Sequence, residues 1–127
     1  MSIKVWDVST LSCVATLKGH MGIVCALVFI GDRLYSGASN SDIKVWDLST
    51  YECMATLTGH SNGVKALVIN GDRLYSGSGD KSIKVWDVST HACVATLLGH
   101  TTNVYALACN GNRLYSGSYD SSIKVWD

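Results

Sequence analysis

Residues 83–87 read Ile-Lys-Val-Trp-Asp, and the same five residues begin again at Ile3, Ile43 and Ile123. Two other stretches recur with this one at the same spacing. Gly-His begins at Gly19, Gly59 and Gly99, and Arg-Leu-Tyr-Ser-Gly begins at Arg33, Arg73 and Arg113. The period is 40 residues without a slip, so the 127 residues are three periods and a remainder of 7. A fixed period of this length is typical of repeat architectures.

Each period predicts four short strands and no helix. In the second full period, residues 64–69 form an apolar run, as expected for a strand buried on both faces. Residues 70–72, Asn-Gly-Asp, predict a tight turn into a second strand at residues 73–77. Residues 83–87 and 93–97 follow as the third and fourth strands. The sequence therefore predicts an all-β chain built from hairpins.

The combination of Gly-His, Ser-Gly-Ser-x-Asp and Ile-Lys-Val-Trp-Asp at this spacing resembles the WD40 repeat over the whole chain. The resemblance implies a β-propeller, with four-stranded blades arranged radially around a channel and the innermost strand first. The compact Asn-Gly-Asp-Arg-Leu-Tyr-Ser-Gly form is most similar to WD40 domains attached to myosin heavy chain kinases and to some RING-type ubiquitin ligases. We treat residues 1–127 as a single domain.

Composition narrows the classes of partner. Charged residues make up 16% of the chain, below the roughly 25% of typical domains. The formal net charge is zero, which predicts no basic surface for nucleic acid or an anionic membrane. No apolar run approaches the ~20 residues of a spanning helix, and the N-terminus lacks the pattern of a signal peptide. We expect a cytoplasmic protein without a metal or cofactor.

Five cysteines are present, and three of them recur at one repeat position: Cys13, Cys53 and Cys93. The odd number and the absence of Cys-x-x-Cys indicate neither a disulfide framework nor a zinc site. We expect all five, including Cys25 and Cys109, to be small buried hydrophobic residues in a reducing compartment.

Every period also contains a His, a Ser, an Asp or Asn and a Trp at fixed spacing. The three sets are His20, Ser36, Asn40 and Trp46; His60, Ser76, Asp80 and Trp86; and His100, Ser116, Asp120 and Trp126. A hydrolase with a Ser-His-Asp triad is one interpretation. The structural interpretation is stronger, because a catalyst needs one site and no Gly-x-Ser-x-Gly motif surrounds any of the serines.

The WD40 resemblance assigns these positions to a buried network that runs from the indole N–H to Ser, from Ser to His and from His to Asp. Such a network satisfies polar groups between packed blades, each bond contributing on the order of 1 kcal/mol. Asn40 departs from the pattern. Its amide can still accept a bond from His20, although without the charge assistance of a carboxylate. We expect Asn40→Asp to raise thermal stability.

The predicted blades cannot close a ring within one chain. Residues 2–18 form a partial blade of a third and a fourth strand, residues 24–58 and 64–98 form full blades, and residues 104–127 form a blade without its outer strand. Propellers typically have 4–8 blades, and end blades that expose apolar faces invite association. We therefore expect a head-to-tail homo-oligomer. A homodimer with six blades is favoured over a homotrimer with nine.

One strand is surplus in such a ring. Residues 2–6 and residues 122–126 have the same sequence and compete for one slot. We expect the C-terminal copy to occupy it, because Ser116 and Asp120 reach Trp126 through its own hairpin. The position of the other copy is left open, as is the question of whether the chain is natural, an excerpt of a longer array or a design.

Loops before the first strand and after the second strand of each blade open on one face, which we call the loop face. WD40 proteins usually bind partners there. Residues in these loops vary between periods while the framework is identical, although drift in unconstrained loops explains this equally well. Exposed Tyr is enriched at interface hot spots. The candidate protein-binding residues are Met21, Ile23, Lys65, Asn103, Tyr105 and Tyr119.

The leading functional hypothesis is a non-catalytic scaffold that binds a peptide or protein across the loop face. The alternatives are a self-assembling propeller fragment or repeat-based design without an evolved ligand, a lectin-like propeller and, least favoured, a Ser-His-Asp hydrolase.

Overall fold

The computed structural model describes all residues, 1–127, as thirteen strands without a helix. The strands are β1 Ser2–Trp6, β2 Cys13–Lys18, β3 Val24–Ile30, β4 Arg33–Ala38, β5 Ile43–Asp47, β6 Cys53–Leu57, β7 Val64–Asn70, β8 Arg73–Ser78, β9 Ile83–Asp87, β10 Cys93–Leu97, β11 Val104–Asn110, β12 Arg113–Ser118 and β13 Ile123–Trp126. No element is a helix that could cross a membrane. The predicted all-β class is confirmed.

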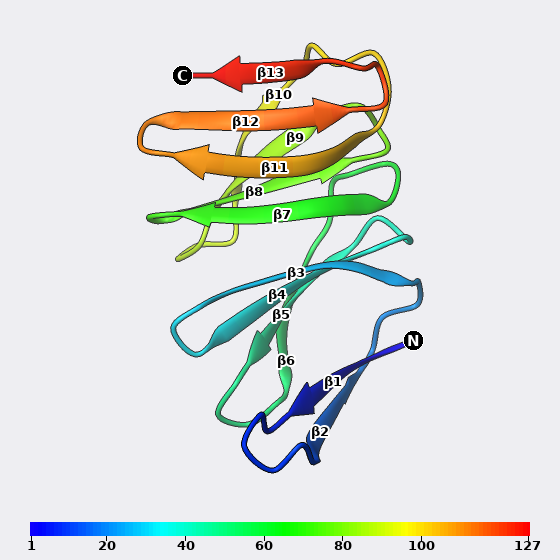
Figure 1. Ribbon diagram of the computed structural model, residues 1–127, viewed down its shortest axis with the longest axis vertical. Coiled ribbons are helices and arrows are strands. Elements are labelled where there is room, and N and C mark those ends of the chain that lie inside the picture. Colours follow the sequence, from blue (N-terminus) through cyan, green and yellow to red (C-terminus); the bar gives the residue numbers. More distant parts are fainter.

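The strands form antiparallel sheets that follow one another along the long axis of the molecule (Figure 1). Blade 1 is β3–β6 and blade 2 is β7–β10, each with its strands in sequence order. Blade 3 is the three-stranded sheet β11–β13. The N-terminal hairpin, β1 paired with β2, lies at the opposite end of the array from blade 3 (Figure 1). The predicted three blades are therefore present, and they form an open fan.

The hairpin turn between the first two strands is one residue tighter than predicted. In blade 2, Asn70 belongs to β7 and pairs with Arg73, so only Gly71 and Asp72 form the turn. Gly71 has a φ of 63°. A two-residue hairpin turn with a positive φ at its first position favours glycine there, because glycine has no Cβ to clash.

The turn between the third and fourth strands is closed by an aspartate. Asp87 Oδ1 accepts hydrogen bonds from Ser89 N at 2.8 Å, Ser89 Oγ at 2.6 Å and Thr90 N at 3.1 Å. These bonds, with the Ser89 hydroxyl first, lower the pKa of Asp87 to about 2. Asp7 and Asp47 close the equivalent turns through Ser9 and Ser49. This Asp-closed turn is thus formed in the N-terminal hairpin as well as in the full blades.

The main core lies between blade 1 and blade 2. Seven buried residues form it: Tyr35, Ile43, Val45 and Leu57 from blade 1, and Val64, Leu74 and Trp86 from blade 2. Gly37 allows the blades to approach, because a Cβ at this position would lie 2.5 Å from Val64 Cγ1. Gly77 has the same relation to Val104, at 2.8 Å, in the junction between blades 2 and 3. The repeated glycine is therefore a packing requirement between blades.

The N-terminal hairpin packs against blade 1. Ile3 and Leu17 pack with Trp46 in a small buried cluster, against which Val24 also lies. Both copies of the surplus strand are paired in the single chain, β1 with β2 and β13 with β12. The competition for one slot predicted from the sequence therefore does not arise within one chain.

The cysteines are not buried, so that prediction is wrong. Cys13, Cys25, Cys53 and Cys93 are exposed, and Cys109 is half-buried. Three of them lie on the outermost strand, at the rim of a blade, where the thiol of Cys93, for example, donates to Ala95 O at 3.4 Å. No neighbouring sheet covers this rim.

Candidate functional site

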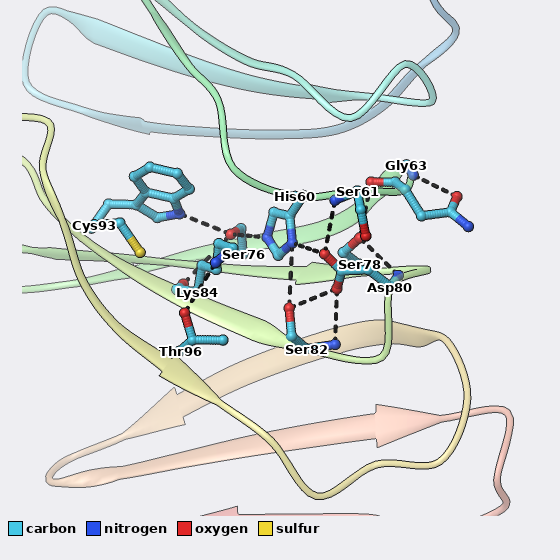
Figure 2. Close-up of polar contacts among 12 residues, drawn as sticks. His60, Ser61, Gly63, Ser76, Ser78, Asp80, Ser82, Lys84, Cys93 and Thr96 are labelled. Atoms are coloured by element: carbon cyan, nitrogen blue, oxygen red, sulfur yellow. Dashed lines mark hydrogen bonds and ion pairs between the residues drawn. The ribbon is translucent and has the colours of Figure 1, made fainter.

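The predicted network of blade 2 forms one continuous chain of hydrogen bonds. Trp86 Nε1 donates to Ser76 Oγ at 2.9 Å, and His60 Nε2 lies 2.7 Å from the same Oγ. His60 Nδ1 lies 2.7 Å from Asp80 Oδ2. Figure 2 shows His60 between Ser76 and Asp80. Since Asp80 accepts from Nδ1–H, Nε2 carries no proton and accepts from the Ser76 hydroxyl.

Asp80 accepts hydrogen bonds from several donors. Its carboxylate also accepts from Ser61 N at 3.1 Å, Ser82 N at 2.9 Å and Ser82 Oγ at 2.6 Å. Burial opposes ionisation of Asp80, but the bonds from Ser82 and His60 outweigh it and lower its pKa to about 2. Burial also lowers the pKa of His60, against the opposing effect of Asp80. The ground state at neutral pH is therefore a neutral His60 beside a charged Asp80.

Blade 3 repeats this arrangement. His100 lies 2.7 Å from Ser116 Oγ and 2.8 Å from Asp120 Oδ2, and Trp126 Nε1 donates to Ser116 at 2.8 Å. The hydroxyl of Ser122 donates to Asp120 and, first among several bonds, lowers the pKa of that carboxyl.

Blade 1 lacks the hydrogen bond between its histidine and residue 40. His20 Nε2 lies 2.5 Å from Ser36 Oγ, and Trp46 Nε1 donates to Ser36 at 2.8 Å. Asn40 does not accept from His20, contrary to expectation; its Nδ2 donates to Asp42 Oδ2 at 3.1 Å. His20 Nδ1 and Asn40 Oδ1 are buried without a partner. The physical reason is Asp42, which replaces the serine of the other blades and draws the amide towards itself.

The network cannot act as an acyl-transfer triad in this geometry. Ser36, Ser76 and Ser116 are each 0% exposed, so no substrate carbonyl reaches their hydroxyls. Each of these oxygens already accepts a bond from an indole N–H. The arrangement ties the loop before the first strand of each blade to the second and third strands.

The loop face is held together by backbone bonds that repeat in every blade. Ser39 N donates to Ile23 O at 2.8 Å, Gly79 N to Gly63 O at 2.9 Å and Tyr119 N to Asn103 O at 3.1 Å. The loop before the first strand and the loop after the second strand therefore adjoin.

The six predicted binding residues do not form one patch. Met21 and Ile23 are exposed on blade 1. Tyr105 and Tyr119 pack against each other on blade 3, with ring centroids 4.7 Å apart, and Tyr119 is 67% exposed. Lys65 on blade 2 and Asn103 are half-buried. Two separate groups thus lie at the two ends of the array.

The apolar faces that the sequence predicted for the end blades are formed by residues whose equivalents are buried in the other blades. On blade 1, Leu27 and Phe29 are exposed, whereas their equivalents Leu67 and Ile69 pack against the main core. On blade 3, Ile123 is 74% exposed, whereas Ile43 is 0% exposed. Identical residue types carry no signal of a missing neighbour. Only the three-dimensional order of the blades shows which copies of each residue form these flanks.

The repeated arginines have different partners in blades 1 and 2. Arg73 Nη1 lies 3.0 Å from Asp87 Oδ2. Arg33 Nη1 instead donates to the backbone oxygen of Val88, in the next blade, at 3.0 Å. His91 is half-buried, and its burial lowers its pKa.

Known structures share both the fold and part of the sequence. The crystal structure of the computationally designed Ika4 protein matches with a TM-score of 0.90 and 36% identity, covering 98% of this chain and 78% of that one. The crystal structure of the computationally designed Ika8 protein matches with a TM-score of 0.88 and 37% identity, covering 98% of this chain and 39% of that one. Comparison with curated proteins gives no match. The family "WD domain, G-beta repeat" matches residues 11–47, 51–87 and 91–127. The chain therefore belongs to the WD40 repeat family.

Proposed function

We propose that this chain is a non-catalytic propeller unit that assembles head to tail with copies of itself into a closed ring. One observation carries the proposal. The two open flanks are the two halves of a contact that the chain makes twice internally.

The glycine–valine contact illustrates this complementarity. Val64 packs on Gly37 and Val104 packs on Gly77, where a Cβ would lie 2.5 and 2.8 Å away. Gly117 is the third such glycine, and a Cβ there would meet only Ala106 Cβ, at 3.5 Å. Val24 is the matching valine at the other end of the array. Head-to-tail docking brings Val24 of one copy onto Gly117 of the next.

Apolar side chains at the two ends support the same pairing. Phe29 is 69% exposed at the N-terminal flank, and Val125 is 55% exposed at the C-terminal flank. At the internal junction the equivalent residues, Ile69 and Val45, pack in one core. At about 25 cal/mol per Å² of apolar surface removed from water, closing this junction is favourable. Uncovered flanks of this kind mark association sites.

Strand exchange completes the end blade in this proposal. Blade 3 lacks a fourth strand, and β2 of the next copy supplies one. Because β1 and β13 then compete for the third-strand slot, one of the two leaves it. Two chains supply six blades, within the usual range, and three supply nine. We favour the homodimer.

The similarity to computationally designed proteins favours a unit whose function is assembly itself. The two shares of 78% and 39% make the Ika8 chain about twice as long as the Ika4 chain. Arrays of this repeat therefore fold at more than one length, as expected when each repeat contacts only its neighbours.

Light scattering at micromolar concentration tests the proposal, with the Gly117→Val variant as the probe. Wild type should have twice the mass of one chain. Gly117→Val should be a folded monomer, because its added methyls have room in the single chain but meet Val24 of the second copy. Circular dichroism checks the fold. Val94→Ala, at an exposed rim position, serves as the control and should assemble like wild type. A wild-type monomer would overturn the proposal.

An interaction platform on the loop face is the second candidate, in line with the resemblance to domains attached to kinases and ubiquitin ligases. The pair Tyr105 and Tyr119 favours it, because aromatic side chains exposed together are enriched at interface hot spots. Affinity capture followed by mass spectrometry tests it, with Tyr119→Ala as the variant. A partner retained equally by both proteins would contradict a role for the tyrosine pair.

A further inference from the structure

Val88 lies at one edge of the junction between blades 1 and 2. It follows β9 in the Asp87-closed turn, and its side chain packs against the main core, which contains Tyr35. Its backbone is held on both sides of the junction. Val88 N donates to Asp72 O at 3.0 Å, and Val88 O accepts from Arg33 Nη1 at 3.0 Å. The bond to Asp72 lies within blade 2 and the bond from Arg33 comes from blade 1, so Val88 links the two blades by packing and by one hydrogen bond.

The N-terminal hairpin presents the same turn without a junction to close. Asp7 Oδ1 accepts from Ser9 N at 2.8 Å and Thr10 N at 3.1 Å, as Asp87 does in blade 2. Leu11 has a φ of 59°, close to the 63° of His91. Val8, the equivalent of Val88, is 89% exposed. The turn is thus preformed, and its apolar residue has no contact surface of its own.

At the junction between blades 2 and 3 the contact surface is present and the apolar residue is missing. A cavity of about 420 Å³ lies there, where no residue takes the place of Val88. Residues that line it include Tyr75, Val85, Leu97, Leu114 and Trp126. Each lies 40 positions after a residue of the core against which Val88 packs.

The two groups equivalent to those that bind Val88 make no hydrogen bond across this junction. The carbonyl of Asn112, equivalent to that of Asp72, accepts no bond of the Val88 type. Arg73, equivalent to Arg33, has no backbone acceptor across the junction and pairs with Asp87 in its own blade at 3.0 Å. The apolar lining and the Asn112 carbonyl of the cavity are therefore the equivalents of the groups that Val88 meets between blades 1 and 2.

We propose that Val8 of a second copy of this chain fills the cavity between blades 2 and 3. Its N–H donates to the Asn112 carbonyl and its carbonyl accepts from Arg73. The inference rests on the self-assembly proposed above and names the contact that locks the ring. It requires β1 to take the third-strand slot, because Val8 and the Asp7-closed turn follow β1 directly.

The dissociation constant for self-association of the Val8→Asp variant, compared with that of wild type, measures the contribution of this contact. Six of the eleven residues that line the cavity are hydrophobic, and the others include Arg113 and Asp127. A carboxylate buried among the hydrophobic side chains is costly, so the dissociation constant should rise by about 10-fold or more. Val8 is exposed in the single chain, so the variant should keep the wild-type fold. Val8→Leu should assemble within about 2-fold of wild type, since Leu48 is the natural residue at this position in blade 1.

Val14→Asp is the matched control for an added charge on the N-terminal hairpin. Val14 is exposed, and its equivalents Met54 and Val94 remain exposed even where both neighbouring blades are present. The ring should leave Val14 uncovered, so this variant should assemble like wild type.

Alkylation of Cys109 reports directly on the occupied cavity. Cys109 lines the cavity and is half-buried, whereas Cys93 is exposed. Mass spectrometry after limited iodoacetamide treatment should show Cys109 protected in assembled wild type and reactive after dilution, with Cys93 reactive throughout. Assembled wild type with a reactive Cys109, or a Val8→Asp ring as tight as wild type, would overturn this inference while leaving self-assembly intact. A wild-type monomer would overturn both.

Discussion

Blades 1 and 2 share one framework but treat their buried histidines differently. His60 bonds Ser76 through Nε2 and Asp80 through Nδ1, so both ring nitrogens are paired. His20 bonds only Ser36, and its Nδ1 is buried without a partner. An unpaired buried donor or acceptor costs about 1–3 kcal/mol. Blade 1 is therefore the blade with the weaker network.

The difference comes from two coupled positions. Blade 2 has an acceptor at Asp80 and a donor at Ser82, and the two bond each other while Asp80 remains available to His60. Blade 1 reverses these roles, with the Asn40 amide donating to Asp42. Asn40 and Asp42 bond each other, and His20 Nδ1 is left without a partner. A network position is thus defined by its partners, and replacing one residue in it does not restore the pattern.

The largest effect should come from removing the histidines in turn. His60→Ala leaves Asp80 without its partner at a site where the two side chains are 0% and 10% exposed. The variant loses two hydrogen bonds, one of them to a charged carboxylate, so the free energy of unfolding should fall by about 3–4 kcal/mol. His20→Ala should cost only about 2 kcal/mol, because it breaks one bond and removes an already unpaired nitrogen. Chemical denaturation of both variants measures the difference, and equal losses would contradict it.

A double substitution should convert blade 1 to the pattern of blade 2. Asn40→Asp with Asp42→Ser places a carboxylate opposite His20 and a hydroxyl donor beside it. We expect the unfolding free energy to rise by about 1–2 kcal/mol, which is a rise of several degrees in the melting temperature of a domain of this size.

Asn40→Asp alone is the control for this conversion. The sequence predicted a gain from the single change, but Asp42 would then face a second carboxylate, and like charges at close range repel. The gain of the single variant should therefore fall clearly below that of the double variant. A single variant as stable as the double one would show that Asp42 plays no part.

The smallest effect should be the pH dependence of stability. Burial lowers the pKa of both His20 and His60. Below the unfolded value of 6.5 the unfolded chain therefore binds protons that the folded chain does not, and stability falls as the pH decreases. The contribution is complete above about pH 6.5. Asp80, with a pKa of about 2, adds a further loss only below 3.8.

Melting temperatures at about pH 7.5 and pH 5 measure this loss. The loss should shrink in the double variant, because a carboxylate beside His20 favours its protonated form. A melting temperature that is constant over this interval in wild type would contradict the neutral, buried histidines.

Most of the fold could be predicted from the sequence because its signals are local. The apolar run at residues 64–69 and the Ile-Lys-Val-Trp-Asp strand at residues 83–87 fix their strands by pattern alone. The errors arose where a residue's environment depends on a distant neighbour. Cys93 was expected to be buried, but it lies on the outermost strand, which no sheet covers.

The candidate site divides in the same way. The chain of bonds from Trp86 to Asp80 follows from the resemblance, since each period brings its own four residues. The orientation of Asn40 could not be predicted, because an amide can turn either face to its neighbours and Asp42 decides which. The exposure of Val8 could not be predicted either, because the partly buried Val88 is the same residue type at the same position of the repeat.

The sequence alone determined the repeat, the four-stranded unit and the residues that pack one blade on the next, because a period of 40 residues places the same side chains in the same positions. Only the tertiary structure decided which copies of those side chains find a neighbour. Val88 is partly covered and Val8 is exposed, although both follow the same Trp-Asp pair. Burial depends on what lies across a junction, and that is a property of the arrangement of blades rather than of any one of them.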